Sequence, residues 1–175
     1  KKLMSICHAG LAPLLKVDAT SDGHWIFVSE AIRGVTLLEH VKGMGLSRRN
    51  HLELFIAICK AVHGLHQHCI VHRDLRPSKI LVDGKANPKI VDFGVATLTD
   101  FDRRLPADVA ESQGLGHLWH YRSPEQQRGA IEQVDIRADI YALGVILGEL
   151  LTGNLPRNPK DDGGFAVRGE LGAIV

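Results

Sequence analysis

Two short stretches of this sequence combine acidic and basic residues in a pattern that could carry out chemistry. Residues 71–82 have the sequence VHRDLRPSKILV, and residues 89–94 have the sequence KIVDFG. An ionised carboxylate can accept a proton from a hydroxyl group or bind a hard cation through oxygen. The aspartates of the two stretches, Asp74 and Asp92, are 92 − 74 = 18 positions apart. This spacing leaves room for a loop and a short hairpin that returns the second carboxylate to the first.

Both stretches resemble motifs of the protein kinases. Residues 71–82 resemble the catalytic loop H-R-D-L-x-x-x-N, and residues 89–94 resemble the D-F-G motif. Residues 121–125 (YRSPE) are similar to the A-P-E motif, and residues 139–144 (DIYALG) resemble the start of the family's central buried helix. Because the four motifs follow the family's order, the sequence is identified as a member of that family over about residues 10–156. Within the family, the sequence is most similar to the bacterial eukaryotic-like Ser/Thr protein kinases.

This resemblance implies transfer of the γ-phosphate of ATP to a protein Ser/Thr hydroxyl group, with ATP and Mg²⁺ as cofactors. Asp74 would accept or orient the proton of the substrate hydroxyl, and Asp92 would bind Mg²⁺ between the phosphates. Arg76 would also be catalytic, because it keeps the positive charge of the lysine that Ser/Thr kinases usually carry at this position.

By the same resemblance, the adenine ring would lie between a hinge and a strand of the large lobe. Ser29 would be the gatekeeper, and the backbone of Glu30, Ala31 and Ile32 would meet the adenine. Leu81 would lie under the purine.

Six further residues would have structural or regulatory roles in such a site. Arg73 would brace the activation segment, Phe93 would pack beneath Asp92, and Asp139 would support the backbone of the catalytic loop. The full set is His72, Arg73, Phe93, Gly94, Glu125 and Asp139. Thr97, Thr99 and Ser112 would be available as phosphorylation sites.

The sequence departs from the family pattern at positions that affect activity. Lys79 stands where the family has an asparagine that binds a second Mg²⁺, and an ammonium group cannot ligate a cation. Leu118 replaces a threonine whose hydroxyl would reach Asp74. The 175 residues contain no G-x-G-x-x-G and no V-A-I-K lysine. These departures leave open a pseudokinase that serves as a binding or scaffolding module, and they predict negligible activity for this chain alone.

The choice of substrate hydroxyl is also left open by the motifs. Arg76 is found in some tyrosine kinases, whereas Pro77 and residues 123–126 favour Ser/Thr kinases. A different class of function follows from His63, His66, His68 and His72 beside Cys69, which could suggest a metal-binding protein. Their spacing is not that of a known zinc site.

Hydrophobic periodicity predicts the elements that would position the motifs. Strands are expected at residues 14–17 and 25–28, followed by a short helix near residues 37–41. Residues 47–69 and about 135–151 predict two long, largely buried helices, because apolar residues cover much of each circumference. Shorter strands are expected at residues 70–71, 79–82 and 89–91, and a long loop at residues 99–123.

Composition fits a globular domain and excludes several other classes. Hydrophobic residues make up 45% and charged residues 23%, which argues against a disordered, collagenous or coiled-coil chain. A net charge of +1 gives no electrostatic reason to bind nucleic acid or a membrane surface. Three cysteines far apart in the sequence predict a reducing, cytoplasmic compartment.

The expected fold class is α+β, as an incomplete protein kinase domain. Residues 1–29 would be the end of the small N-terminal lobe, residues 30–34 the hinge, and residues 35–175 an incomplete C-terminal lobe.

Overall fold

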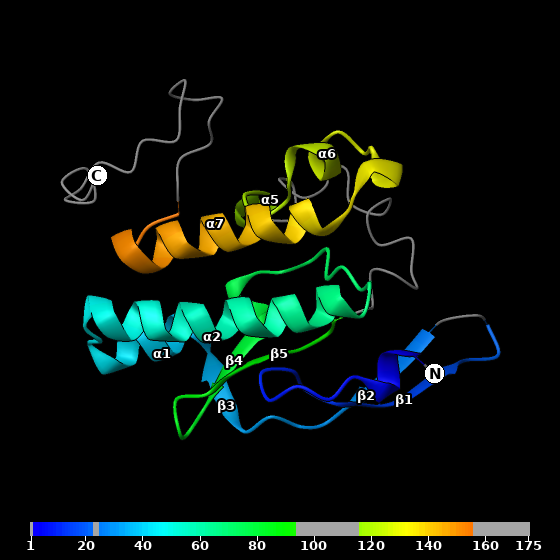
Figure 1. Cartoon of the computed structure of the whole chain (residues 1–175), viewed down its shortest axis with the longest axis horizontal. Coiled ribbons are helices and arrows are strands. Elements are labelled where there is room, and N and C mark those ends of the chain that lie inside the picture. The colour runs from blue at the N-terminus through cyan, green and yellow to red at the C-terminus, as the bar shows by residue number, and fades with distance from the viewer. Residues whose placement is uncertain (1, 23–24, 94–115, 156–175) are drawn as a thin grey trace.

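Two long helices lie side by side at the centre of the structure, a computed structural model that describes residues 2–22, 25–93 and 116–155. Figure 1 shows that α2 (Arg48–Gln67) and α7 (Ile136–Thr152) run antiparallel. A small sheet contacts the other side of α2 through its last strand. The structure therefore mixes helices and sheets, as the expected α+β class requires.

The helix α2 begins and lies where the periodicity predicts, but it is buried on one face only. Ser47 is its N-cap, and its hydroxyl oxygen accepts a hydrogen bond from the Asn50 N–H at 3.3 Å. The buried face carries Leu54, Ile58, Ala61, Val62, Gly64 and Leu65. Leu52 and Ile56 are 42% and 51% exposed, so the expectation of a largely buried helix was wrong for that face. Apolar residues around a helix indicate burial only where another element covers them.

The helix α7 is also bounded by local signals in the sequence. Asp135 caps its N-terminus by accepting a hydrogen bond from the Arg137 N–H at 2.8 Å. Gly153 ends it in the left-handed conformation, with φ = 73°. Two acidic side chains of this mostly apolar helix, Asp139 and Glu149, are buried at 1% and 9% exposure. Buried charges require partners, and both partners belong to the site described below.

The strands form two separate sheets. In the first, β1 (Leu14–Ala19) pairs antiparallel with β2 (Trp25–Ser29), which confirms the strands expected there. The second has the antiparallel order β3 (Gly34–Thr36), β4 (Ile80–Asp83) and β5 (Pro88–Ile90). β4 and β5 begin within one residue of the expected strands. The strand expected at residues 70–71 was wrong, because these residues form no strand and belong to the connection that follows α2.

The strand β3 was not predicted from the sequence, and it depends on a glycine. A Cβ atom at Gly34 would lie 2.3 Å from the carbonyl oxygen of Val82. The close approach of β3 to β4 is therefore possible only because residue 34 has no side chain.

Short helices connect the larger elements. α1 (Leu37–Met44) occupies the position expected for a helix after residue 37, and a capping box between Thr36 and Glu39 closes its first turn. The others are η1 (Lys2–Ser5), η2 (Pro77–Lys79), α5 (Gly116–Trp119), α6 (Pro124–Gln127) and η4 (Ile131–Gln133). The prediction of a loop over residues 99–123 was wrong at its end, where α5 forms. The earlier part of that loop lies outside the described residues.

The buried core joins α2, α7 and the three-stranded sheet. Its most deeply buried side chains include Leu37, Ile58, Leu65, Ile80, Ile90 and Ile146, each 0% exposed. No helix within residues 2–22, 25–93 and 116–155 is long and apolar enough to cross a membrane. The loop that follows α2 and the turn that follows β5 both lie over this core.

Candidate active site

One buried imidazole ring holds the two aspartates of the sequence motifs in neighbouring segments. His72 is 0% exposed, and its Nδ1 accepts a hydrogen bond from the Asp74 N–H at 3.3 Å. Its Nε2 lies 3.1 Å from the carbonyl oxygen of Val91, to which it can only donate. In this arrangement the ring accepts at Nδ1 and donates at Nε2. It joins the backbone of Asp74 to the residue that precedes Asp92.

The Asp139 carboxylate supports this loop from helix α7. Its Oδ1 accepts a hydrogen bond from the Arg73 N–H at 2.9 Å, and its Oδ2 accepts one from the His72 N–H at 2.8 Å. The Nε2 of His66, on α2, lies 2.8 Å from the same Oδ2. Three donors therefore satisfy a carboxylate that is only 1% exposed. This contact fixes the start of the loop to both central helices.

Two residues of the site have backbone conformations that are uncommon outside glycine. Arg73 has φ = 64° and Asp92 has φ = 58°, both in the left-handed region. Such conformations persist only where the surrounding structure enforces them. At Arg73, the hydrogen bond from its backbone N–H to Asp139 holds the residue in this conformation. Asp92 follows Val91, which is held by His72 and by a hydrogen bond from its own N–H to the Lys79 carbonyl oxygen at 3.0 Å.

Each aspartate is paired with a basic side chain of the same loop. The Arg76 Nε lies 3.1 Å from Asp74 Oδ1, and the Lys79 ammonium donates to Asp92 Oδ2. Arg76 and Asp74 are 19% and 24% exposed, and Lys79 is 22% exposed, whereas Asp92 is 48% exposed. The four charges sum to zero.

This donor set does not fit the magnesium arrangement implied by the sequence resemblance. Mg²⁺ requires oxygen ligands in near-octahedral geometry. Residue 79 instead presents an ammonium group to the carboxylate of Asp92, and Asp74 is engaged by Arg76. The site therefore lacks the second oxygen ligand and holds a cation of its own beside the first.

A further contact joins the loop to the segment that carries the A-P-E-like motif. Gln126 Nε2, in α6, donates to the Arg73 carbonyl oxygen at 2.7 Å. Arg73 Nε is buried and has no hydrogen-bond partner among the described residues. The structure thus brings α6 and the Arg73 backbone together.

The Tyr121 hydroxyl donates to the buried carboxylate of Glu149. Burial and this carboxylate raise the pKa of Tyr121 well above its usual value. The contact joins the segment before α6 to the last turn of α7.

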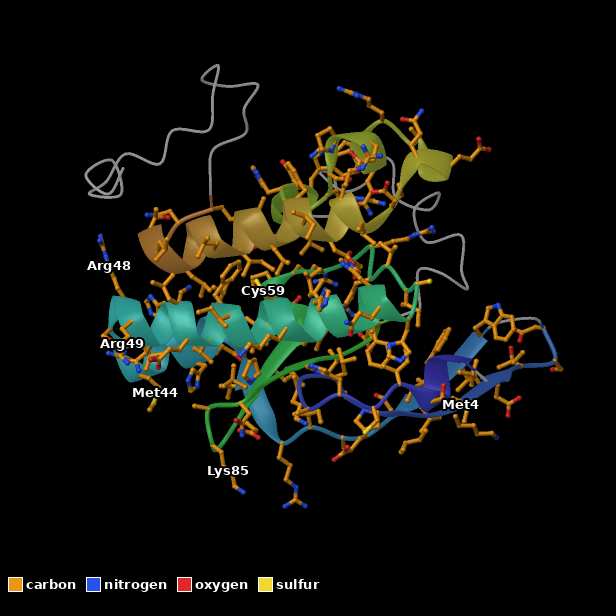
Figure 2. All side chains as sticks on the ribbon, viewed as in Figure 1. Met4, Met44, Arg48, Arg49, Cys59 and Lys85 are labelled. Carbon is orange, nitrogen blue, oxygen red and sulfur yellow. The ribbon has the colours of Figure 1, made fainter. Side chains whose placement is uncertain are left out.

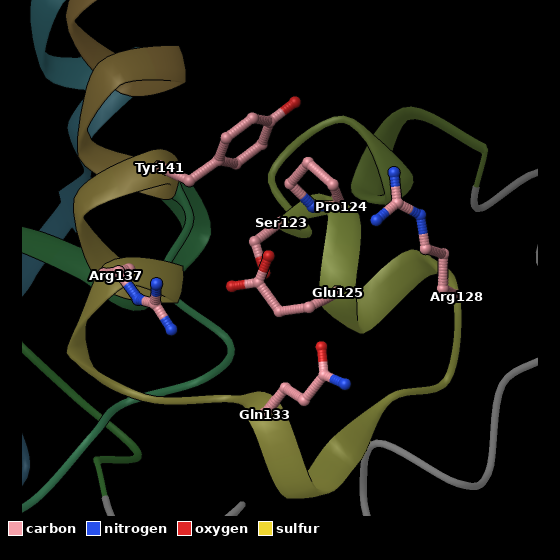
Figure 3. A pocket seen from close by; sticks show the side chains of 7 residues that line it. All are labelled: Ser123, Pro124, Glu125, Arg128, Gln133, Arg137 and Tyr141. Carbon is pink, nitrogen blue, oxygen red and sulfur yellow. The ribbon is translucent and has the colours of Figure 1, made fainter.

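Glu125 lies on the other side of α6. With Arg128, Arg137 and Tyr141, it lines a pocket of about 340 Å³. Figure 3 shows its side chain pointing toward α7, the helix that carries Arg137 and Tyr141.

The remaining residues expected in the site lie on other elements. Ser29 ends β2, and Glu30, Ala31 and Ile32 form the connection from β2 to β3. Within it, the Glu30 N–H donates to the Pro13 carbonyl oxygen at 2.9 Å. Leu81 lies in β4, Phe93 is buried beside Asp92 in sequence, and Leu118 is half-buried in α5. Gly94, Thr97, Thr99 and Ser112 lie outside the described residues.

Three of the four histidines considered for a metal site make contacts of another kind. His66 and His72 take part in the network around Asp139, and His68 Nδ1 lies 2.8 Å from the Gly64 carbonyl oxygen. Within the part of the chain that the structure describes, no three His, Cys, Asp or Glu side chains cluster as they would around a metal ion.

The sequence did not predict the contacts of three residues in this site: His66, Gln126 and Glu149. Glu149 carried a usable signal, because an acidic residue inside an apolar helix needs a buried partner. His66 lies on a helix where it could equally well face solvent. Gln126 ends the stretch 123–126 that favours Ser/Thr kinases, but nothing in the sequence indicates that its side chain contacts the Arg73 carbonyl oxygen.

Comparison with known proteins places these motifs in a family. The sequence matches the protein kinase domain over residues 3–168. It is 35% identical over 153 residues to the serine/threonine-protein kinase PrkC of Bacillus subtilis, which covers 87% of this chain and 22% of that protein. It is 38% identical over 131 residues to the serine/threonine-protein kinase PknB of Mycolicibacterium smegmatis, covering 74% and 20% of the two chains. The chain thus spans about one fifth of the length of these curated relatives. The resemblance and fold class expected from the motifs are confirmed.

Proposed function

Because the chain belongs to the protein kinase domain family, we propose that it forms the catalytic part of an ATP-dependent protein serine/threonine kinase. The observation that best supports this function is the His72 ring, which ties the Asp74 backbone to the segment of Asp92. A reaction between two bound molecules depends on such fixed positions of the reacting and stabilising groups.

In the proposed reaction, Asp74 accepts the proton of the substrate hydroxyl. The hydroxyl oxygen forms a bond to the γ-phosphorus while the bond from that phosphorus to the ADP oxygen breaks. Arg76 and Lys79 place two positive charges at the carboxylates where the phosphates arrive, and charge stabilisation of this kind dominates phosphoryl transfer. Family members generally use ATP with Mg²⁺.

The remaining residues have supporting roles in this proposal. Residues 30–34 serve as the hinge between a small lobe that ends at residue 29 and the large lobe from residue 35. The adenine contacts are proposed for Ser29, Glu30, Ala31, Ile32 and Leu81. His72, Arg73, Phe93, Gly94, Glu125 and Asp139 hold or regulate the loop and its neighbouring segment. The unpaired cysteines favour a cytoplasmic site of action.

A second candidate function is favoured by one contact. The ion pair of Lys79 with Asp92 occupies the carboxylate that would otherwise assist transfer. This contact supports a pseudokinase, in which the same fold binds nucleotide or a protein partner without transferring phosphate.

A transfer assay distinguishes the two functions. The natural protein at its full length is incubated with ATP labelled at the γ-phosphate and a general protein substrate, and labelled phosphoserine and phosphothreonine are measured. Asp74→Asn is expected to lower transfer by about 10²–10⁴-fold. Asp18→Asn, at an exposed position on β1, is the matched control and should leave transfer unchanged.

ATP binding without transfer by the wild-type protein would support the pseudokinase, and phosphotyrosine as the only product would overturn the proposed specificity. Residues 1–175 alone are expected to show negligible transfer, because the sequence contains no glycine-rich phosphate loop and no V-A-I-K lysine.

A further inference from the structure

We propose that Lys79 takes the place of a divalent cation at Asp92, so that this protein binds the phosphates of its nucleotide without a metal ion at that carboxylate. The inference rests on the proposed function, because it assigns the charge at the same phosphate site. It differs from the usual kinase reaction in one respect, because Asp92 would bind the Lys79 ammonium and not Mg²⁺.

Backbone contacts fix Lys79 in this position. Its carbonyl oxygen accepts the Val91 N–H at 3.0 Å, and its own N–H donates to the Arg76 carbonyl oxygen at 2.9 Å. The residue is therefore held on one side by the turn η2 and on the other by the residue before Asp92. A lysine placed in this way differs from a surface lysine, whose ion pairs contribute little because the side chain must be ordered first.

The charge pattern opposes a metal ion at Asp92. A divalent cation bound there would lie next to the Lys79 ammonium, in a site where Asp74 is already paired with Arg76. With the four side chains summing to zero charge, the site has no excess negative charge to offset two further positive charges. Asparagine at position 79 would instead offer an oxygen ligand.

The same ammonium group is suited to phosphate. It has three N–H donors, and one of them is used by Asp92. The other two can reach phosphate oxygens, and lysine commonly binds phosphate as a point charge. Lys79 can thus bridge Asp92 and a phosphate, which is the electrostatic task that a bound cation performs in other sites of this kind.

Mn²⁺ binding tests the cation part of this inference without requiring nucleotide. The full-length protein is titrated with Mn²⁺, and free Mn²⁺ is followed by electron paramagnetic resonance. Lys79→Asn is expected to bind Mn²⁺ at least ten-fold more tightly than the wild type, and the gain should vanish in the Lys79→Asn/Asp92→Asn double variant. Lys79→Arg keeps the charge and should behave as the wild type does.

Lys85→Asn is the matched control for the loss of one positive charge. Lys85 is exposed on the turn between β4 and β5, and Figure 2 shows it at the outer end of that turn. It should leave Mn²⁺ binding unchanged. Equal Mn²⁺ affinity of the wild type and Lys79→Asn, or a gain that survives removal of the Asp92 carboxylate, overturns the inference. Circular dichroism of every variant checks that the fold is retained.

Nucleotide binding then separates this inference from the proposed function. The affinity of the wild type for a fluorescent ATP analogue should agree within two-fold between EDTA and Mg²⁺, whereas Lys79→Asn should bind at least ten-fold more weakly in EDTA. A wild type that needs Mg²⁺ for binding overturns the inference. Absence of ATP binding under both conditions overturns the proposed function, while the Mn²⁺ titration still decides the role of Lys79.

Discussion

Removal of the Asp139 carboxylate should destabilise the protein more than any single change at an exposed charge. Asp139→Ala takes away the common acceptor of the His72 N–H, the Arg73 N–H and His66 Nε2. The site is 1% exposed, so water cannot replace the lost acceptor without opening the structure. The loop that carries Asp74 then loses its attachment to α7.

The magnitude follows from the stranded donors. A buried donor left without a partner costs about 1–3 kcal/mol, and the two backbone N–H groups cannot turn away as the His66 ring can. The expected loss in the free energy of unfolding is therefore about 3–5 kcal/mol, which agrees with the cost of removing one partner from a buried charged group. Asp139→Asn retains one oxygen acceptor and should lose about 2 kcal/mol.

Urea unfolding followed by far-ultraviolet circular dichroism measures these differences. Asp135→Ala is the matched control, because Asp135 lies on the first turn of the same helix but is 50% exposed. It removes an N-cap and an exposed ion pair with Arg137, and should cost about 1 kcal/mol. If Asp139→Ala proved no more destabilising than Asp135→Ala, the hydrogen-bond network around Asp139 would not support the loop as described.

Two further predictions concern α7 and the three-stranded sheet. Since the pKa of Tyr121 is raised by burial and by Glu149, its contribution to stability is full below about pH 10 and is lost as the pH rises above that value. Tyr121→Phe should therefore flatten the fall in unfolding free energy between pH 9 and pH 11, and equal slopes would contradict the assignment. Gly34→Ala should cost about 1–3 kcal/mol in thermal unfolding because its Cβ would meet the Val82 carbonyl oxygen. Gly43→Ala, where a Cβ meets no atom within 4 Å in helix α1, should instead add about 0.5–1 kcal/mol.

The long elements of the fold could be predicted because their signals are local. Ser47 and Asp135 cap the two central helices, and Gly153 ends the second, as their residue types indicate. The strand β3 could not be predicted, because its three residues form a strand only through pairing with β4, which is more than 40 positions away in sequence. The exposed face of α2 was mispredicted for the same reason. Periodicity shows which residues are apolar, but it does not show which element covers them.

The site was predictable to the level of motifs but not to the level of contacts. Asp74 and Asp92 could be selected from their motifs, and Lys79 could be recognised as a departure from the expected asparagine. The sequence could not show that the Lys79 ammonium donates to Asp92, or that Gln126 reaches the Arg73 carbonyl oxygen. Both contacts depend on how separate segments pack over the core.

The turn η2 sets the spacing of the two basic residues of the loop, Arg76 and Lys79. Arg76 is its N-cap and Lys79 its last residue, and the Lys79 N–H donates to the Arg76 carbonyl oxygen at 2.9 Å. In a 3₁₀ turn, side chains three positions apart lie on the same side. Arg76 and Lys79 therefore face the same region, where one pairs with Asp74 and the other with Asp92. The lysine at position 79 thus completes a set of two carboxylates and two cations. The turn η2 carries both cations at its ends, and Asp74 and Asp92 supply the carboxylates from either side, so neither carboxylate is left unpaired.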